Sequence, residues 1–192
     1  MKPGKIFLSL ALVAAGACGV AHAANVAPLP LHAGSNTFKL GKSGETVIAM
    51  LGRRENFNAH SFDVLTLYIK PAPAQGDDTD WQFVSIFEHG KEALTLSSSG
   101  GADCLLHDFR LLKDPAHGGL SLVVAERELG ASYADDAPVT FKFYQFKRNT
   151  EGDVGMPMFY FELTDSRQAK KPYCDVGTAF AKELNIGPYR AK

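Results

Sequence analysis

The sequence has little cysteine, little tryptophan and almost no net charge. Its 192 residues include three cysteines and one tryptophan, too few for a small domain held together by several disulfides. The 20 basic and 21 acidic side chains nearly balance, so no basic surface indicates nucleic acid or anionic lipid as a partner. With 45% hydrophobic residues, the composition is typical of one ordinary globular domain.

Long hydrophobic runs are missing from the body of the chain, and the one such run lies at the N-terminus. Lys2 and Lys5 flank or precede an apolar stretch over residues 6–21, and Ala21-His22-Ala23 is a cleavage site of small residues. This layout predicts a secretory signal peptide over residues 1–23, since the run is short for a membrane span. Lipidation at Cys18 is the alternative interpretation.

Cleavage after Ala23 leaves residues 24–192, with a net charge of −3 and two cysteines, Cys104 and Cys174. No linker interrupts this segment, so we expect it to form a single β-sandwich domain. Paired thiols in an exported protein meet an oxidising environment and become disulfides. We therefore predict a Cys104–Cys174 bridge, which removes about 4 kcal/mol of unfolded-chain entropy. Two buried free thiols are the alternative.

Short segments with strand-like periodicity, separated by turn residues, follow one another through most of the mature chain. Their spacing of roughly ten residues predicts a mainly β protein, an antiparallel β-sandwich of about nine strands. The segments that alternate in hydrophobicity or are rich in β-branched residues are 37–40, 45–51, 62–70, 81–87, 93–97, 104–113, 120–127, 138–147 and 158–163.

The last part of the chain changes to helical periodicity. Val176, Phe180 and Leu184 are spaced four residues apart, behind Asp175 and before Gly187-Pro188. Aspartate is a favourable N-cap and Gly-Pro a favourable stop, so we predict a short C-terminal α-helix. Bridging of Cys174 to Cys104 would fix the start of this helix to the sheet.

Common catalytic motifs are absent from the sequence. Ser-x-x-Lys, Gly-x-Ser-x-Gly and His-Glu-x-x-His do not occur, and no two histidines of the mature chain have the spacing of a local zinc pair. We therefore expect that the protein is not an enzyme and needs no cofactor. A hydrolase whose site residues converge only in three dimensions is the alternative.

One acidic turn offers oxygen ligands for a cation. Asp77, Asp78 and Asp80 lie within four residues, although without the spacing of an EF-hand loop. They are weak candidates for a metal site, and a solvated acidic turn is the simpler interpretation.

A polar stretch over residues 52–63 separates two strongly apolar strands. Its ionisable and amide side chains can form either a ligand-binding pocket or a structural hydrogen-bond network, because buried polar groups must be satisfied together. Both interpretations stay open. The candidate binding residues are Arg54, Glu55, Asn56, Asn58 and His60.

The same stretch takes part in a family resemblance that covers most of the mature chain. Several separate segments, in order, resemble the carbapenem intrinsic resistance (CarG-like) family. They are residues 54–62 (Arg-Glu-Asn-Phe-Asn-Ala-His-Ser-Phe), 101–104 (Gly-Ala-Asp-Cys), 108–110 (Asp-Phe-Arg), 130–135, 138–141, 160–162, 173–176 and 187–190 (Gly-Pro-Tyr-Arg).

The resemblance implies a periplasmic β-sandwich, usually a homodimer, related in fold to periplasmic lysozyme inhibitors. It implies protection of cell-wall synthesis from β-lactams without hydrolysis, with a β-lactam or a cell-wall enzyme as partner, and a guanidinium of Arg53 or Arg54 would suit a β-lactam carboxylate. It also implies a bound cation at a turn that here reads Lys42-Ser43-Gly44-Glu45, where one carboxylate and one ammonium disfavour it. A lysozyme inhibitor that inserts the loop 115–119 is the alternative function.

Overall fold

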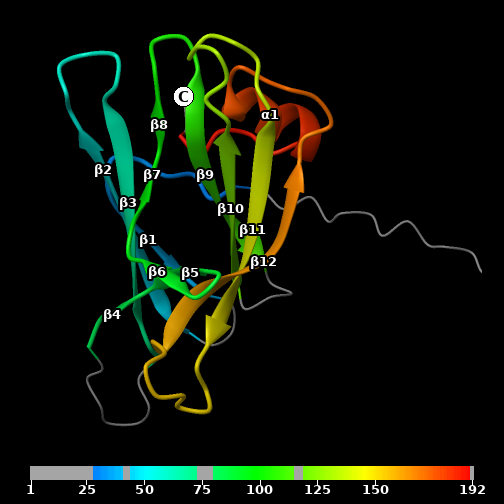
Figure 1. The fold of residues 1–192 in the computed structure, drawn as a ribbon. Coiled ribbons are helices and arrows are strands. Elements are labelled where there is room, and N and C mark those ends of the chain that lie inside the picture. The colour runs from blue at the N-terminus through cyan, green and yellow to red at the C-terminus, as the bar shows by residue number, and fades with distance from the viewer. Residues whose placement is uncertain (1–27, 41–43, 73–79, 115–118, 191–192) are drawn as a thin grey trace, which may run out of the picture.

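Two β-sheets face each other, and one helix covers the outer face of the larger sheet (Figure 1). The computed structural model describes residues 28–40, 44–72, 80–114 and 119–190. Within these residues the smaller sheet has the order β1-β2-β3-β4, and β7 also pairs with β3. Its strands are β1 (Gly34–Lys39), β2 (Thr46–Arg54), β3 (Phe62–Lys70), β4 (Gln82–Phe83) and β7 (Leu96–Ser97).

The larger sheet has seven strands in the order β6-β5-β12-β11-β10-β9-β8. All of its neighbours are antiparallel except β5 and β12, which run parallel. Its strands are β5 (Ser85–Glu88), β6 (Lys91–Ala93), β8 (Ser99–Gly100), β9 (Leu105–Asp114), β10 (Gly119–Arg127), β11 (Val139–Arg148) and β12 (Phe159–Gln168).

The predicted mainly β fold with a C-terminal helix is confirmed, but the strand count and one pairing differ from expectation. The described residues contain twelve strands rather than about nine. The segment 81–87 divides into β4 and β5, and 93–97 divides into β6 and β7, because the chain crosses from one sheet to the other at each break. The serine run, which the sequence presents as a break, supplies the short strand β8. Such crossings depend on distant partner strands, which local periodicity does not report.

Alternation along the strands builds the core between the sheets. Leu65, Leu67 and Ile69 of β3 are buried on the face that meets Phe109 and Leu111 of β9. A pleated strand points every second side chain to the same face, so each strand contributes a row of apolar residues to this core. The first inward position of β3, however, is Asp63.

A second core lies between the larger sheet and α1 (Val176–Leu184). The Phe180 ring packs 5.6 Å from that of Phe141, and both side chains are buried. Asp175 caps the helix by accepting a 2.8 Å hydrogen bond from the Thr178 amide, and Asn185 ends it in the left-handed conformation at φ 55°. No helix in the described part of the chain is long and apolar enough to span a bilayer.

Candidate functional site

The five predicted binding residues lie on the exposed loop between β2 and β3. There they bind mainly to one another. Asn56 donates through its side chain to the His60 carbonyl at 2.8 Å, and Asn58 accepts from the His60 amide at 2.9 Å. Arg54 donates to the Asn56 side chain. These contacts make the loop a self-contained hydrogen-bonded turn on the surface.

Glu55 fixes the tip of this loop. Its Oε1 accepts hydrogen bonds from the amides of Asn56 at 3.0 Å and Phe57 at 2.9 Å, and from the Ser61 hydroxyl. The Ser61 hydrogen bond is the largest cause that lowers the pKa of Glu55. The cap holds Phe57 in the left-handed region at φ 56° with its side chain 95% exposed. The loop therefore presents an aromatic ring to solvent.

His60 is the one predicted residue that reaches a hollow between loops. Its Nδ1 lies 3.1 Å from the Gly100 carbonyl, and its ring is 6.1 Å from that of Tyr133. Together with Leu129 they border a hollow of 690 Å³ at the end of the larger sheet. The other four predicted residues do not line it.

A cluster of buried charges lies directly beside the predicted stretch, and it begins at Asp63. This carboxylate is only 6% exposed, since it occupies an inward position of β3. Its Oδ2 accepts a 2.9 Å hydrogen bond from the Tyr189 hydroxyl and forms an ion pair with Arg190. Its Oδ1 lies 4.0 Å from Nη1 of Arg53. The C-terminal tail is thus tied to the smaller sheet.

The larger sheet contributes Asp108 and Arg110, which lie two residues apart on β9 and are 3% and 2% exposed. Arg110 donates to Asp108 Oδ2 and, at 2.8 Å, to the Gly187 carbonyl. Its guanidinium carbon lies 4.4 Å from the ring centre of Phe180, a favourable cation–π contact. Burial raises the pKa of Asp108, although the charge and hydrogen bond of Arg110 oppose the rise.

These residues surround a cavity of 300 Å³, called here the tail cavity. It is lined by Arg53, Asp63, Asp108, Arg110, Tyr189 and Arg190, among others. The side chains of Arg53 and Arg190 remain 52% and 45% exposed, which places two guanidinium groups in contact with solvent. Guanidinium groups of this kind bind carboxylates and phosphates in bidentate geometry.

Sequence reasoning selected the stretch 52–63 but missed most of the tail cavity. Asp108, Arg110, Tyr189 and Arg190 belong to segments noted only for their family resemblance. The structure brings these segments together with the end of the polar stretch, although they are separated by up to 126 residues. A carboxylate at an inward position of an otherwise apolar strand, as at Asp63, is the signal that could have indicated the cluster.

A second polar group, also missed, lies on the inter-sheet face of the larger sheet beyond the apolar core. Lys142 lies 2.8 Å from both Glu88 and Glu126, and Tyr144 donates to Glu88 at 2.9 Å. His107 pairs with Glu126 across the β9–β10 register, with 3.6 Å between Nε2 and Oε1. A hollow of 500 Å³ borders this group, called here the polar row.

Hydrogen bonds set the pKa values in the polar row. The bond with His107 is the largest cause that lowers the pKa of Glu126 to about 2, against the effect of burial. For Glu88, burial alone would raise the pKa, but hydrogen bonds from Lys142 and Tyr144 outweigh it and the pKa falls. Burial raises the pKa of Tyr144. Both carboxylates of the row therefore stay ionised with their partners in place.

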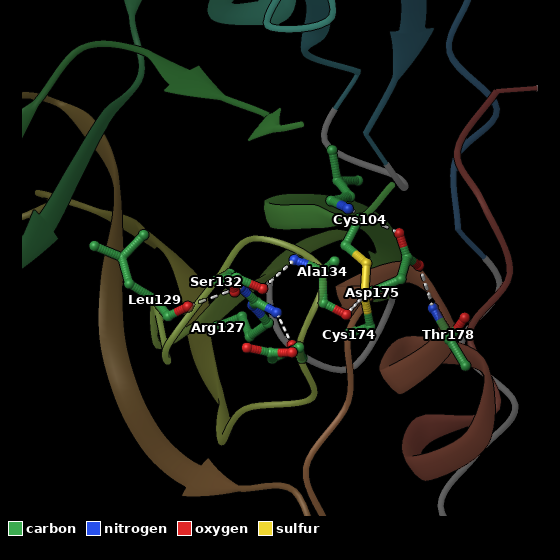
Figure 2. Close-up of a disulfide and its surroundings, with 10 residues drawn as sticks. Cys104, Arg127, Leu129, Ser132, Ala134, Cys174, Asp175 and Thr178 are labelled. Atoms are coloured by element: carbon green, nitrogen blue, oxygen red, sulfur yellow. Dashed lines mark hydrogen bonds between the residues drawn. A yellow bond between two sulfur atoms is a disulfide. The ribbon is translucent and has the colours of Figure 1, made fainter. Parts of the chain in front are cut away.

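The predicted cysteine pair forms a disulfide at the N-terminal end of α1. The Cα atoms of Cys104 and Cys174 are 5.6 Å apart. The neighbouring Asp175 accepts a 3.0 Å hydrogen bond from the Leu105 amide in addition to capping the helix, as Figure 2 shows. Beside the bridge, buried Arg127 donates to carbonyls of the loop after β10. The bridge joins the helix to the start of β9.

Candidate cation ligands are only partly placed by the structure. Asp80 is exposed, whereas Asp77 and Asp78 lie outside the described residues, as do Cys18, residues 115–118 of the proposed inhibitor loop and the signal peptide. Glu45, from the turn discussed above, binds Arg148 through two hydrogen bonds of 3.0 and 2.7 Å. Within the described ranges, no three His, Cys, Asp or Glu side chains are grouped to hold a metal ion.

The fold and the tail cavity define a two-sheet β protein in which buried charges tie the C-terminal tail to both sheets. A family model described as "Carbapenem resistance protein CarG-like" matches residues 31–182, and the chain therefore belongs to the CarG-like family. Among solved structures, one entitled "Crystal structure of CarG" superposes with a TM-score of 0.64 and 22% identity, covering 81% of this chain and 94% of that chain. At this identity the likeness shows the fold. No curated protein matches the chain.

Proposed function

We propose that this chain is a non-catalytic periplasmic binding protein that shields cell-wall synthesis from β-lactams, carbapenems above all, without hydrolysing them. The family match over residues 31–182 is the observation that carries the proposal, because the family is defined by carbapenem resistance. The predicted signal peptide and the disulfide support a role outside the cytoplasm. The homodimer expected of the family is part of the proposal.

The role is assigned to binding because the sequence has none of the three hydrolase motifs sought in it. A carbapenem carries a carboxylate on its fused ring. Arg53 and Arg190, half exposed at the tail cavity, offer two guanidinium groups for such a carboxylate. Sequestering the drug and covering its target are both compatible with this chemistry.

Expression of the full chain, with its own signal peptide, in a carbapenem-sensitive bacterium tests the function. We expect the minimal inhibitory concentration of a carbapenem to rise, and no rise when the same chain is expressed without residues 1–23. Purified protein mixed with the drug should leave the ultraviolet absorbance of the β-lactam ring unchanged with time. Unchanged sensitivity of the exporting strain would remove the proposed function, and loss of the absorbance would replace binding by hydrolysis. Light scattering of the purified protein tests the dimer.

A further inference from the structure

Two carboxylate oxygens face the tail cavity without a hydrogen-bond partner. Oδ1 of Asp63 and Oδ1 of Asp108 are both fully buried, and neither accepts a hydrogen bond within the described part of the chain. A buried acceptor without a donor is costly, by about 1–3 kcal/mol and by more when it is charged. Both residues line the same cavity, so a single group with two or more donors can satisfy both oxygens.

The cations around the cavity restrict what that group can belong to. Arg53, Arg110 and Arg190 line it together with the two aspartates. A simple cation would meet three guanidinium groups, and a simple anion would meet two carboxylates. Arg110 is fully buried and already donates to Asp108 and Gly187, whereas Arg53 and Arg190 keep about half of their side-chain surface exposed. Donors are thus required inside the cavity and acceptors near its exposed arginines.

The spacing of these groups suits a ligand in which the two charges are close together. Nη1 of Arg53 lies 4.0 Å from Asp63 Oδ1, and Arg190 pairs with Oδ2 of the same carboxylate. An ammonium bound at Asp63 Oδ1 therefore lies between two guanidinium groups. In an α-amino acid a single carbon separates the ammonium from the carboxylate, so the carboxylate of such a ligand would reach Arg53 or Arg190.

We propose that the tail cavity binds the zwitterionic group of an α-amino acid, with the ammonium on Asp63 Oδ1 and Asp108 Oδ1 and the carboxylate on Arg53 and Arg190. The volume of 300 Å³ accommodates an amino acid with a short side chain. This site goes beyond the protective function proposed above and does not depend on it. The ammonium supplies three donors for two buried oxygens, and the ligand adds no net charge to the cavity.

Calorimetry and ligand-detected NMR on the exported protein, purified from the periplasm, test the site with glycine and both enantiomers of alanine. We expect saturable binding of at least one of them. N-acetylglycine lacks the ammonium and glycinamide lacks the carboxylate, so each should bind more weakly than glycine by at least about tenfold. Lack of saturable binding by all three amino acids would mean that ordered water only fills the cavity, and would overturn the proposal.

A matched pair of arginine variants locates the binding. Arg53→Gln removes a guanidinium that lines the cavity, whereas Arg54→Gln removes its neighbour, which lies on the outer loop. Both residues are exposed at the end of β2, so both variants should fold, with circular dichroism as the check. We expect affinity to fall by at least about tenfold in Arg53→Gln and to stay unchanged in Arg54→Gln. Equal effects of the two variants would overturn the proposed site.

A carbapenem in the same assay separates this proposal from the proposed function. Binding of the carbapenem through Arg53, without binding of any amino acid, would overturn the zwitterion site and leave the protective function standing. Binding of an amino acid by a protein that gives cells no protection would support the site and remove the function. Competition between the two ligands would place both in the tail cavity and support the site.

Discussion

The Tyr189 hydroxyl donates a 2.9 Å hydrogen bond to Oδ2 of Asp63, across 126 residues of sequence. The same tyrosine ring stacks on Phe109 of the larger sheet, with ring centres 5.0 Å apart. One side chain of the C-terminal tail therefore contacts both sheets. Burial raises the pKa of Tyr189, so the hydroxyl keeps its proton and stays a donor.

Replacing this tyrosine by phenylalanine isolates the hydrogen bond. Tyr189→Phe keeps the stacked ring but leaves a buried carboxylate with one donor fewer, so we expect the free energy of unfolding to fall by about 1–3 kcal/mol. Urea denaturation followed by circular dichroism measures the change. Tyr133→Phe, at a half-exposed tyrosine, is the control and should stay within about 0.5 kcal/mol. Equal stability of both variants and wild type would show that the bond contributes nothing net.

The disulfide should account for a large part of the stability. It joins residues 70 apart in sequence and fixes the start of α1 to β9, so its removal restores a long loop to the unfolded chain. We expect Cys104→Ser/Cys174→Ser to lose about 4 kcal/mol, as measured by urea denaturation. Wild-type protein in excess reductant is the matched control and should unfold at nearly the same midpoint as the double variant. A midpoint unaffected by reductant would contradict this prediction.

Long regular elements could be predicted from the sequence because their signal is local. The strand β3 and the helix α1 have the predicted bounds or differ from them by little, since periodicity, capping and stop residues all lie within each segment. The region 81–100 could not be predicted in the same way. There the chain changes sheets within a few residues, and only the distant partners β3, β9 and β12 determine which sheet each short strand joins.

The candidate site was predictable only at its border. The polar stretch ends at Asp63, but the partners of this carboxylate, Tyr189 and Arg190, are brought to it by the path of the tail around the edge of β9. The polar row likewise depends on register, which places His107 opposite Glu126. Each row member is a polar residue at the end of an inward-facing apolar series, a pattern visible in the sequence only when strand faces are compared.

Acid should weaken the fold partly through Glu126. Its pKa is lowered from 4.5 to about 2 in the folded protein, so the unfolded chain binds this proton more readily. The stabilisation is therefore complete above about pH 4.5 and is lost as the pH falls towards 2, which is the sign expected for a lowered carboxylate pKa. Because the side chain is 38% exposed, solvent screening reduces the contribution to about 1 kcal/mol.

The Glu126→Gln variant tests this dependence on pH. We expect its urea midpoint to fall less steeply than that of wild type between about pH 5 and pH 2, because the variant has no proton to bind at this position. Glu162→Gln, at an exposed glutamate of β12, is the control and should follow the wild-type curve. Parallel curves for wild type and Glu126→Gln would contradict the assigned role of the His107–Glu126 pair.

Arg127 should determine the rigidity of the loop after β10. Although it is only 6% exposed, its partners are carbonyls: Nη2 donates to those of Leu129 at 3.0 Å and Ser132 at 3.1 Å, and Nη1 donates to that of Asp135. A planar guanidinium can bind three carbonyls from one position, whereas a lysine ammonium lacks this fork. Arg127→Lys should therefore lose part of the set and Arg127→Met all of it.

Hydrogen exchange of the loop amides distinguishes this role from a general loss of stability. We expect the amides of Ala134 and Asp135 to exchange faster in Arg127→Lys and faster still in Arg127→Met, which should also unfold with about 2 kcal/mol less free energy. Arg167→Met, at an exposed arginine that lies over Phe143, is the control and should leave exchange in the loop unchanged. If Arg127→Met loses global stability while Ala134 and Asp135 exchange as in wild type, the loop is held by other contacts, because only the guanidinium bonds would connect the two effects.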